Sequence, residues 1–94
     1  MIDKKYLDKI KEITNKYSEN NERFFVFGSS VTEDKFSDID LGFVDGKIDE
    51  DKLRQLKDEL EESLLPYKFD VVDFNKADKE FRDKNLNSKI IWLT

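Results

Sequence analysis

The sequence predicts a small α+β fold in which a mixed β-sheet has its helices packed mainly on one face. Segments with apolar residues every three or four positions alternate along the chain with short apolar runs and with one stretch of period two. The predicted order is helix, strand, loop, strand, helix, strand, helix and apolar tail, which favours one sheet covered by helices. Because 94 residues can surround one modest core, we expect residues 1–94 to form a single domain.

The first predicted element is an amphipathic helix that ends near Asn20. Its apolar residues recur at steps of three and four among Lys, Asp and Glu, and they are Ile2, Tyr6, Leu7, Ile10, Ile13 and Tyr17. A short aromatic run over residues 23–27 stops at Gly28, which favours a buried strand. The polar residues 28–37 are expected to form a loop that can include one helical turn.

A period of two that begins at Asp38 predicts the second strand. Its two faces carry Ile39, Leu41 and Phe43 on one side and Asp38, Asp40 and Gly42 on the other. Asp49 then stands where it can cap a helix that Pro66 ends. The apolar seam of this helix consists of Leu53, Leu56, Leu60 and Leu64.

Residues 68–74 predict a third strand, followed by a short helix that Asp78 can cap and that carries Phe81. The apolar residues 90–93 come next, and two interpretations of them stay open. They form an edge strand or final turn packed on the protein's own core, or they form a contact surface for a partner or a second copy.

The composition excludes several kinds of chemistry. The chain contains no Cys and no His, so disulfides, thiol nucleophiles and imidazole bases are absent, and catalysis must use carboxylates, hydroxyls, amines or the backbone. A formal net charge of −5 opposes bulk binding of nucleic acid. No apolar stretch approaches the length of a membrane span, and we expect a cytoplasmic protein that binds neither nucleic acid nor membrane.

Two features of the second strand and the preceding loop point to a site. Asp38 and Asp40 point the same way from one strand, and two like charges on one face become favourable when a divalent cation such as Mg²⁺ binds between them. The alternative is that both acids line a solvated face. Gly28 and Ser29 directly follow a buried strand, where a tight turn can present backbone N–H groups and a hydroxyl to phosphates. Taken alone, Gly-Ser is also common in ordinary turns.

A third carboxylate lies in the strand over residues 68–74. Asp70 falls on the same face as Val72 and Phe74, whereas Asp73 falls on the opposite face near the strand end. An acid in so apolar a strand is costly unless it is paired or bound to a metal, so Asp70 is the candidate.

These motifs carry a resemblance to a known family. They are Phe24-Phe25-Val26-Phe27-Gly28-Ser29-Ser30, Ser37-Asp38-Ile39-Asp40-Leu41 and Phe69-Asp70-Val71-Val72-Asp73. In this order they resemble the hydrophobic–Gly-Ser, Asp-x-Asp and third-Asp motifs of the DNA polymerase β-like nucleotidyltransferase superfamily. Within it, the chain resembles the minimal nucleotidyltransferases, the MntA-like antitoxins that accompany HEPN-domain toxins, over essentially its whole length.

The resemblance implies a function and a role for each site residue. Gly28 and Ser29 bind the triphosphate, Asp38 and Asp40 hold Mg²⁺, and Asp70 is the third catalytic carboxylate and also a metal ligand. The implied reaction transfers AMP from ATP to a hydroxyl, which in that family is a tyrosine of the partner HEPN-domain toxin. A homo- or hetero-oligomer is compatible with this role.

The loop departs from the family pattern. Members commonly read Gly-Ser-Arg-x-Arg-Gly, whereas Ser30-Val31-Thr32 follows here and eight residues separate Ser29 from Asp38. Lys35 is either a substitute for the missing positive charge or a solvated loop residue. Two other functions therefore stay open: a non-catalytic antitoxin of the same fold, and a nucleotidyltransferase that acts on a small molecule.

Overall fold

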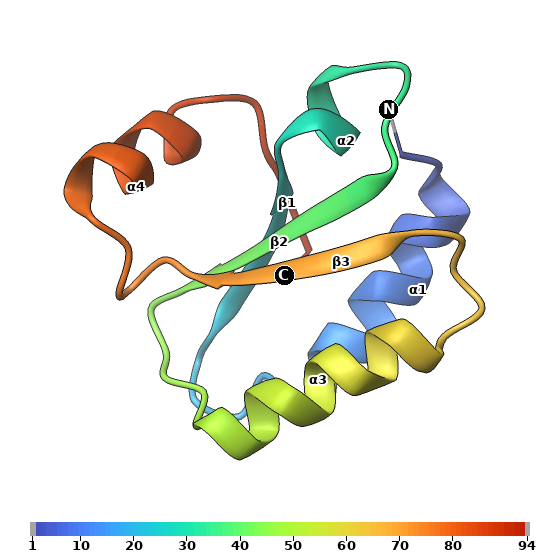
Figure 1. The fold of residues 1–94 in the computed structure, drawn as a ribbon. Helices are drawn as coiled ribbons and strands as arrows, with labels where there is room; N and C mark the ends of the chain where they lie inside the picture. Colours follow the sequence, from blue (N-terminus) through green and yellow to red (C-terminus); the bar gives the residue numbers. More distant parts are fainter. Residues whose placement is uncertain (1, 94) are drawn as a thin grey trace.

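The computed structural model describes residues 2–93 and shows a four-stranded sheet with helices on both faces (Figure 1). Its elements follow the predicted order, and the polar loop contains the short helical turn. They are α1 Lys4–Asn15, β1 Arg23–Phe27, α2 Ser29–Thr32, β2 Asp38–Val44, α3 Glu50–Glu62, β3 Lys68–Asp73, α4 Lys79–Leu86 and β4 Ile91–Trp92.

The sheet is mixed, with the strand order β3-β2-β1-β4. β1 runs antiparallel to both β2 and β4, whereas β2 and β3 are parallel and are joined through α3. A parallel pair needs such a crossover connection, whereas the other strands are joined by α2 or by α4 and its flanking loops. The predicted α+β class with a small mixed sheet is thereby confirmed.

The main core lies between one face of the sheet and the two longest helices, α1 and α3, which lie side by side on that face (Figure 1). The apolar stripes of both helices supply Ile10, Ile13, Leu56 and Leu60, and the strands supply Phe24, Val26, Ile39, Leu41, Phe43 and Val71. All of these side chains are buried. The period of two in β2 thus puts its apolar residues inside and leaves its acids on the opposite face.

The opposite face is partly covered as well, whereas the sequence predicts helices mainly on one face. α4 lies on this side (Figure 1), and Leu86 packs on a second core of four buried residues, Phe25, Phe27, Val44 and Phe74. The ring of Phe81 lies 5.5 Å from that of Phe74. The sequence did not predict that α4 covers this face, because α4 has few apolar residues and therefore shows little hydrophobic periodicity.

Three helix boundaries differ from the prediction. α1 ends at Asn15 rather than near Asn20, because the chain needs the intervening residues to turn back into β1. Ile2 precedes α1, yet it is buried and its N–H donates to the Ser30 carbonyl at 2.9 Å. α3 ends at Glu62, before Pro66, since Ser63 adopts an extended conformation.

The last residue of the expected seam is therefore not in the core. Leu64 lies beyond α3 and is 101% exposed. Both predicted caps are confirmed: the Asp49 carboxylate accepts the Lys52 N–H at 2.8 Å, and the Asp78 carboxylate accepts the Phe81 N–H at 2.9 Å. Among residues 2–93, no helix combines the length and apolar character needed to cross a membrane.

Candidate active site

Gly28 ends β1 in a conformation that only glycine adopts easily. Its φ is +80° and its ψ is −155°, a region in which a side chain is strained. The space beside its α-carbon is also taken, because a β-carbon built there would collide with the Asp40 carboxylate. The backbone of Gly28 and the side chain of Asp40 are thus in close contact, and any other residue at position 28 would have to displace the Asp40 carboxylate.

The helical turn α2 follows Gly28 directly and holds the Gly-Ser segment in place. The Gly28 carbonyl accepts the N–H groups of Val31 and Thr32 at 3.1 and 3.3 Å. Ser29 is half-buried at the start of the turn, and Ser30 is fully buried. The first N–H groups of a helical turn have no partner within the helix, so this turn is suited to face an anionic group.

The strand register places Asp40 between two other elements of the site. On one side it is opposite Phe27, the last residue of β1, and on the other it is level with Asp70 of β3. Asp38 is level with Lys68 in the same parallel pairing. Residues that are level in a sheet share a face, so Asp38, Asp40, Asp70 and Lys68 all lie on the face opposite the main core.

The electrostatics of the site are set by this crowding. Asp38 and Asp70 are exposed, whereas Asp40 is half-buried. Burial, with further contributions from the charges of Asp70 and Asp38, raises the pKa of the Asp40 carboxyl above its ordinary value. Burial and the nearby carboxylates therefore both destabilise a negative charge at Asp40, and a cation bound there would relieve the repulsion.

The acids approach one another without forming a finished metal site. Within the described residues, no three Asp or Glu side chains are close enough together to hold a metal ion as they stand. Oxygen donors of this kind nevertheless suit Mg²⁺, which usually takes one or two carboxylates and completes its shell with phosphate and water. The donor set thus fits a divalent cation that arrives together with a nucleotide.

Asp73 is not part of this group. It is level with Phe43, whose side chain faces the main core, and its carboxylate accepts the Asn75 N–H at 2.9 Å. It borders a separate pocket of about 580 Å³, together with Asp49 and Lys76. Strand parity predicts that Asp70 and Asp73 lie on opposite faces of the sheet, and the structure confirms this prediction.

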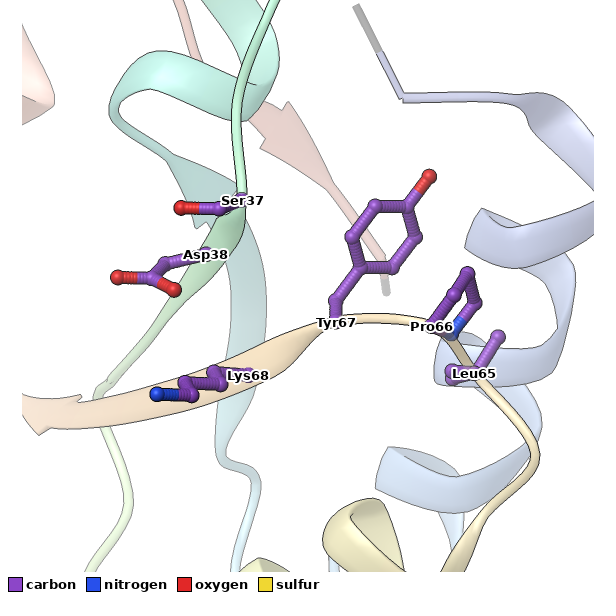
Figure 2. Close-up of a pocket in the computed structure, with 6 residues that line it drawn as sticks. All are labelled: Ser37, Asp38, Leu65, Pro66, Tyr67 and Lys68. Carbon is purple, nitrogen blue, oxygen red and sulfur yellow. The ribbon is translucent and has the colours of Figure 1, made fainter.

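Sequence reasoning missed a groove beside the carboxylates. It has a volume of about 430 Å³ and is lined by Ser37, Asp38, Leu65, Pro66, Tyr67 and Lys68. Figure 2 shows the Ser37, Asp38 and Lys68 side chains extending to one side, whereas the Tyr67 ring and Pro66 lie on the other side, away from the ends of these side chains. The sequence alone indicates that Lys68 and Asp70 share one face of β3, because they are two residues apart. The groove itself depends on the parallel pairing of β2 and β3.

The site therefore combines a tight Gly-Ser turn, a row of carboxylates and an open groove. Lys35, considered as a replacement for a missing positive charge, is exposed on the loop between α2 and β2. This exposure agrees with the interpretation of Lys35 as a solvated loop residue. The turn and the groove flank β2 on opposite sides, with Asp40 and Asp38 between them.

A comparison with models of protein families shows what the chain is similar to. Residues 8–93 match the family model described as "Polymerase beta, Nucleotidyltransferase". No curated protein matches the chain significantly. The matched residues include the Gly-Ser turn, all the acids of the site and every strand. Since the match extends over far more than half of the sequence, the chain belongs to the polymerase β nucleotidyltransferase family.

Proposed function

We propose that this protein transfers AMP from ATP to the hydroxyl of a tyrosine on a HEPN-domain partner protein. In this role it acts in the cytoplasm as the antitoxin of a toxin–antitoxin pair. One observation carries the proposal: the Asp40 carboxylate lies against Gly28 of the Gly-Ser turn and is level with Asp70 across the sheet. The family accounts for nucleotidyl transfer in general, and the resemblance to minimal nucleotidyltransferases supports the acceptor and partner.

Each side chain has a distinct task in this reaction. The Gly28-Ser29 segment binds the triphosphate, and Asp38, Asp40 and Asp70 hold Mg²⁺. The bound metal supplies Lewis-acid stabilisation of the negative charge on the phosphate oxygens. Asp70, the exposed acid on the outer strand β3, accepts the proton of the acceptor hydroxyl.

The bonds change in a single displacement. The acceptor oxygen forms a bond to the α-phosphorus while the bond between that phosphorus and the oxygen bridging to the β-phosphate breaks. Pyrophosphate leaves with the electron pair of the broken bond, and the hydroxyl proton passes to Asp70. No imidazole is needed, which agrees with a chain that has no His.

A second candidate is a non-catalytic antitoxin that blocks its partner by binding alone. Two observations favour it: the acids in residues 2–93 do not stand as a ready metal site, and Ser30-Val31-Thr32 replaces the arginines common in the family. This candidate predicts that the partner is neutralised equally well without ATP.

The deciding experiment supplies ATP labelled at the α-phosphate, with Mg²⁺, to the protein alone and with a co-expressed HEPN-domain protein. Label on a tyrosine of the partner is the expected result. Neutralisation of the partner without label would establish the non-catalytic role, and label only on added small molecules would establish the small-molecule alternative.

Substitutions of Asp38 and Asp40 test the metal site in the same assay. Asp38→Asn or Asp40→Asn should reduce transfer by at least about 100-fold, because each removes a charged ligand of the metal. Without metal, neither variant should melt below the wild type, since the pKa of Asp40 is raised and a neutral amide removes repulsion there.

The control is Asp49→Asn, which leaves the cap of α3 in place because Asn also caps helices. It should keep both transfer and melting temperature. Added Mg²⁺ with ATP should raise the melting temperature of the wild type and of this control, but not that of Asp40→Asn. Wild-type transfer by either site variant would show that the assignment is wrong.

A further inference from the structure

One basic side chain lies beside the carboxylates of the candidate site. The strands within residues 2–93 carry two basic residues, Arg23 and Lys68. Arg23 stands at the start of β1, and its guanidinium lies 4.1 Å from the centre of the Trp92 ring. Lys68 is level with Asp38, and it shares a face of β3 with Asp70, two residues further on. Lys68 is therefore the basic residue of the sheet that stands next to the acids.

The Lys68 side chain extends in the same direction as the acid with which it is level. Figure 2 shows the Lys68 and Asp38 side chains extending to one side, and both residues line the groove beside the site. Lys68 is exposed and takes part in none of the ion pairs within residues 2–93. Neighbouring strands lie about 4.8 Å apart, so an anionic group held at Asp38 comes within reach of the flexible lysine stem.

The charges of the site leave a task for this cation. Asp38, Asp40 and Asp70 lie on one face of the sheet. A nucleotide brings further negative charge to this face, and the charge of one divalent cation offsets only part of the total. An ammonium group within reach of a phosphate strengthens its binding, because charge-assisted hydrogen bonds are stronger than those between neutral groups.

The position of Lys68 in the sheet indicates which phosphate it contacts. The Gly-Ser turn contacts Asp40 from the β1 side of β2, whereas Lys68 belongs to β3, on the other side of β2. A phosphate chain that begins at the turn and crosses β2 at Asp38 and Asp40 therefore has its far end next to Lys68. When the β- and γ-phosphates occupy the turn, that far end is the α-phosphate.

We propose that Lys68 binds the α-phosphate of the nucleotide, across the row of carboxylates from the Gly-Ser turn. The ammonium donates hydrogen bonds to a non-bridging oxygen of the phosphoryl group that is transferred, while the turn holds the two phosphates that leave. This inference rests on the proposed function for the identity of the reaction. The contact itself is detected by binding of ligands that cannot react, so it can be measured separately from transfer.

The test uses two ligands that carry the two ends of the phosphate chain separately. AMP contains the α-phosphate alone, and inorganic pyrophosphate replaces the β- and γ-phosphates. Each ligand is titrated with Mg²⁺ into the full chain, and the backbone amide signals in NMR give its dissociation constant. AMP should shift the amides of Asp38 and Lys68, and pyrophosphate should shift those of residues 28–30.

Variants of Lys68 make the test quantitative. Lys68→Gln should weaken AMP binding by about tenfold, the loss expected for one charge-assisted hydrogen bond, and should leave pyrophosphate affinity within about twofold of the wild type. Lys68→Arg should retain most of the AMP affinity, because it keeps the charge. Lys35→Gln is the matched control, since it removes one charge from the exposed loop between α2 and β2 and should weaken neither ligand.

Binding of Mg²⁺ alone separates a phosphate contact from general damage to the site. Without nucleotide, Lys68→Gln should bind Mg²⁺ at least as tightly as the wild type, because it removes a positive charge beside the carboxylates. A lysine that only balances the acids within the fold gives a different result. Its replacement would lower the melting temperature of the metal-free protein and leave AMP affinity unchanged.

The outcomes separate this contact from the reaction. Weaker AMP binding by Lys68→Gln with unchanged pyrophosphate binding supports the contact, even when no AMP is transferred and the proposed function fails. Equal AMP affinity, an equal loss for both ligands, loss of Mg²⁺ binding by Lys68→Gln, or no binding of AMP to the wild type overturns it. AMP transfer that is unaffected by Lys68→Gln also overturns the contact while leaving the proposed function intact.

Discussion

Asp40 lies at the centre of the candidate site, between the Gly-Ser turn and Asp70. Its carboxylate lies against the backbone of Gly28, where a β-carbon would collide with it, and its strand neighbour is Asp70. The protein keeps this acid half-buried although burial and like charges raise its pKa. An arrangement that costs stability without a ligand is typical of functional sites, where the free energy of binding offsets it.

Asp70 and Asp73 should differ sharply in their importance. Asp70→Ala should lower the rate of AMP transfer by about 100-fold or more, the usual effect of removing a proton acceptor. Asp73→Ala should retain most of the rate and lose only the hydrogen bond to the Asn75 N–H, about 1 kcal/mol of stability. Initial rates with labelled ATP and urea unfolding measure the two effects. The opposite ranking would remove Asp70 from the site.

Gly28→Ala should damage both stability and transfer. The alanine must adopt a positive φ and displace the Asp40 carboxylate, which should cost about 1–3 kcal/mol and disturb the metal ligands. The control is Ser30→Ala two positions away, because the buried Ser30 hydroxyl has no hydrogen-bond partner within the described chain. Its removal should leave melting temperature and transfer unchanged or slightly improved. Equal behaviour of the two variants would contradict the close contact at Gly28.

At the scale of elements, the apolar run over residues 90–93 forms the outer edge of the sheet. Ile91 and Trp92 pair with Val26 and Phe25 of β1, which confirms the edge-strand interpretation. The Trp92 ring lies 5.0 Å from the Phe25 ring and 4.1 Å from the Arg23 guanidinium. Trp92 is still 40% exposed, so the alternative of a contact surface applies to that side chain only and stays a prediction.

Leu93 should be the main anchor of this edge. It is 3% exposed and its N–H donates to the Phe24 carbonyl at 2.9 Å. Leu93→Ala should therefore lower the free energy of unfolding by about 2–5 kcal/mol, the usual cost of truncating a buried leucine. Urea unfolding at constant pH measures the change. An unchanged midpoint would show that the run contributes little to the core.

At the scale of the whole molecule, the sequence predicted what depends on local pattern. Helix caps, the alternation of β2 and the parity of Asp70 follow from neighbouring residues, and all three agree with the structure. Leu64 fits the leucine periodicity as well, but periodicity does not reveal that the chain leaves the helix at Ser63. Features that need two distant segments, such as the level pairing of Asp40 with Asp70 and the groove, require the folded chain.

An ionic contact joins the residues that directly follow α1 to α3. The Glu59 carboxylate accepts hydrogen bonds from the Lys16 ammonium at 2.6 Å and from the Tyr17 hydroxyl at 2.9 Å. The hydrogen bonds from Lys16 and Tyr17, opposed in part by burial, lower the pKa of Glu59 below its ordinary value of 4.5. The end of α1 is thus linked to α3 through the negative charge of Glu59, and protonation of this carboxylate in acid removes that charge.

Stability should consequently fall in acid in a way that depends on Glu59. A carboxyl whose folded-state pKa is lowered contributes its full stabilisation above its ordinary value of 4.5, and loses it as the pH falls through the folded-state pKa. Glu59→Gln should therefore melt below the wild type at neutral pH, and the difference should shrink to nothing in stronger acid. The control Glu61→Gln changes an exposed glutamate of the same helix and should show no such convergence. Melting curves across this range measure both differences. A gap between wild type and Glu59→Gln that persisted below the folded-state pKa would mean that packing of the glutamate stem, rather than its charge, joins the helices.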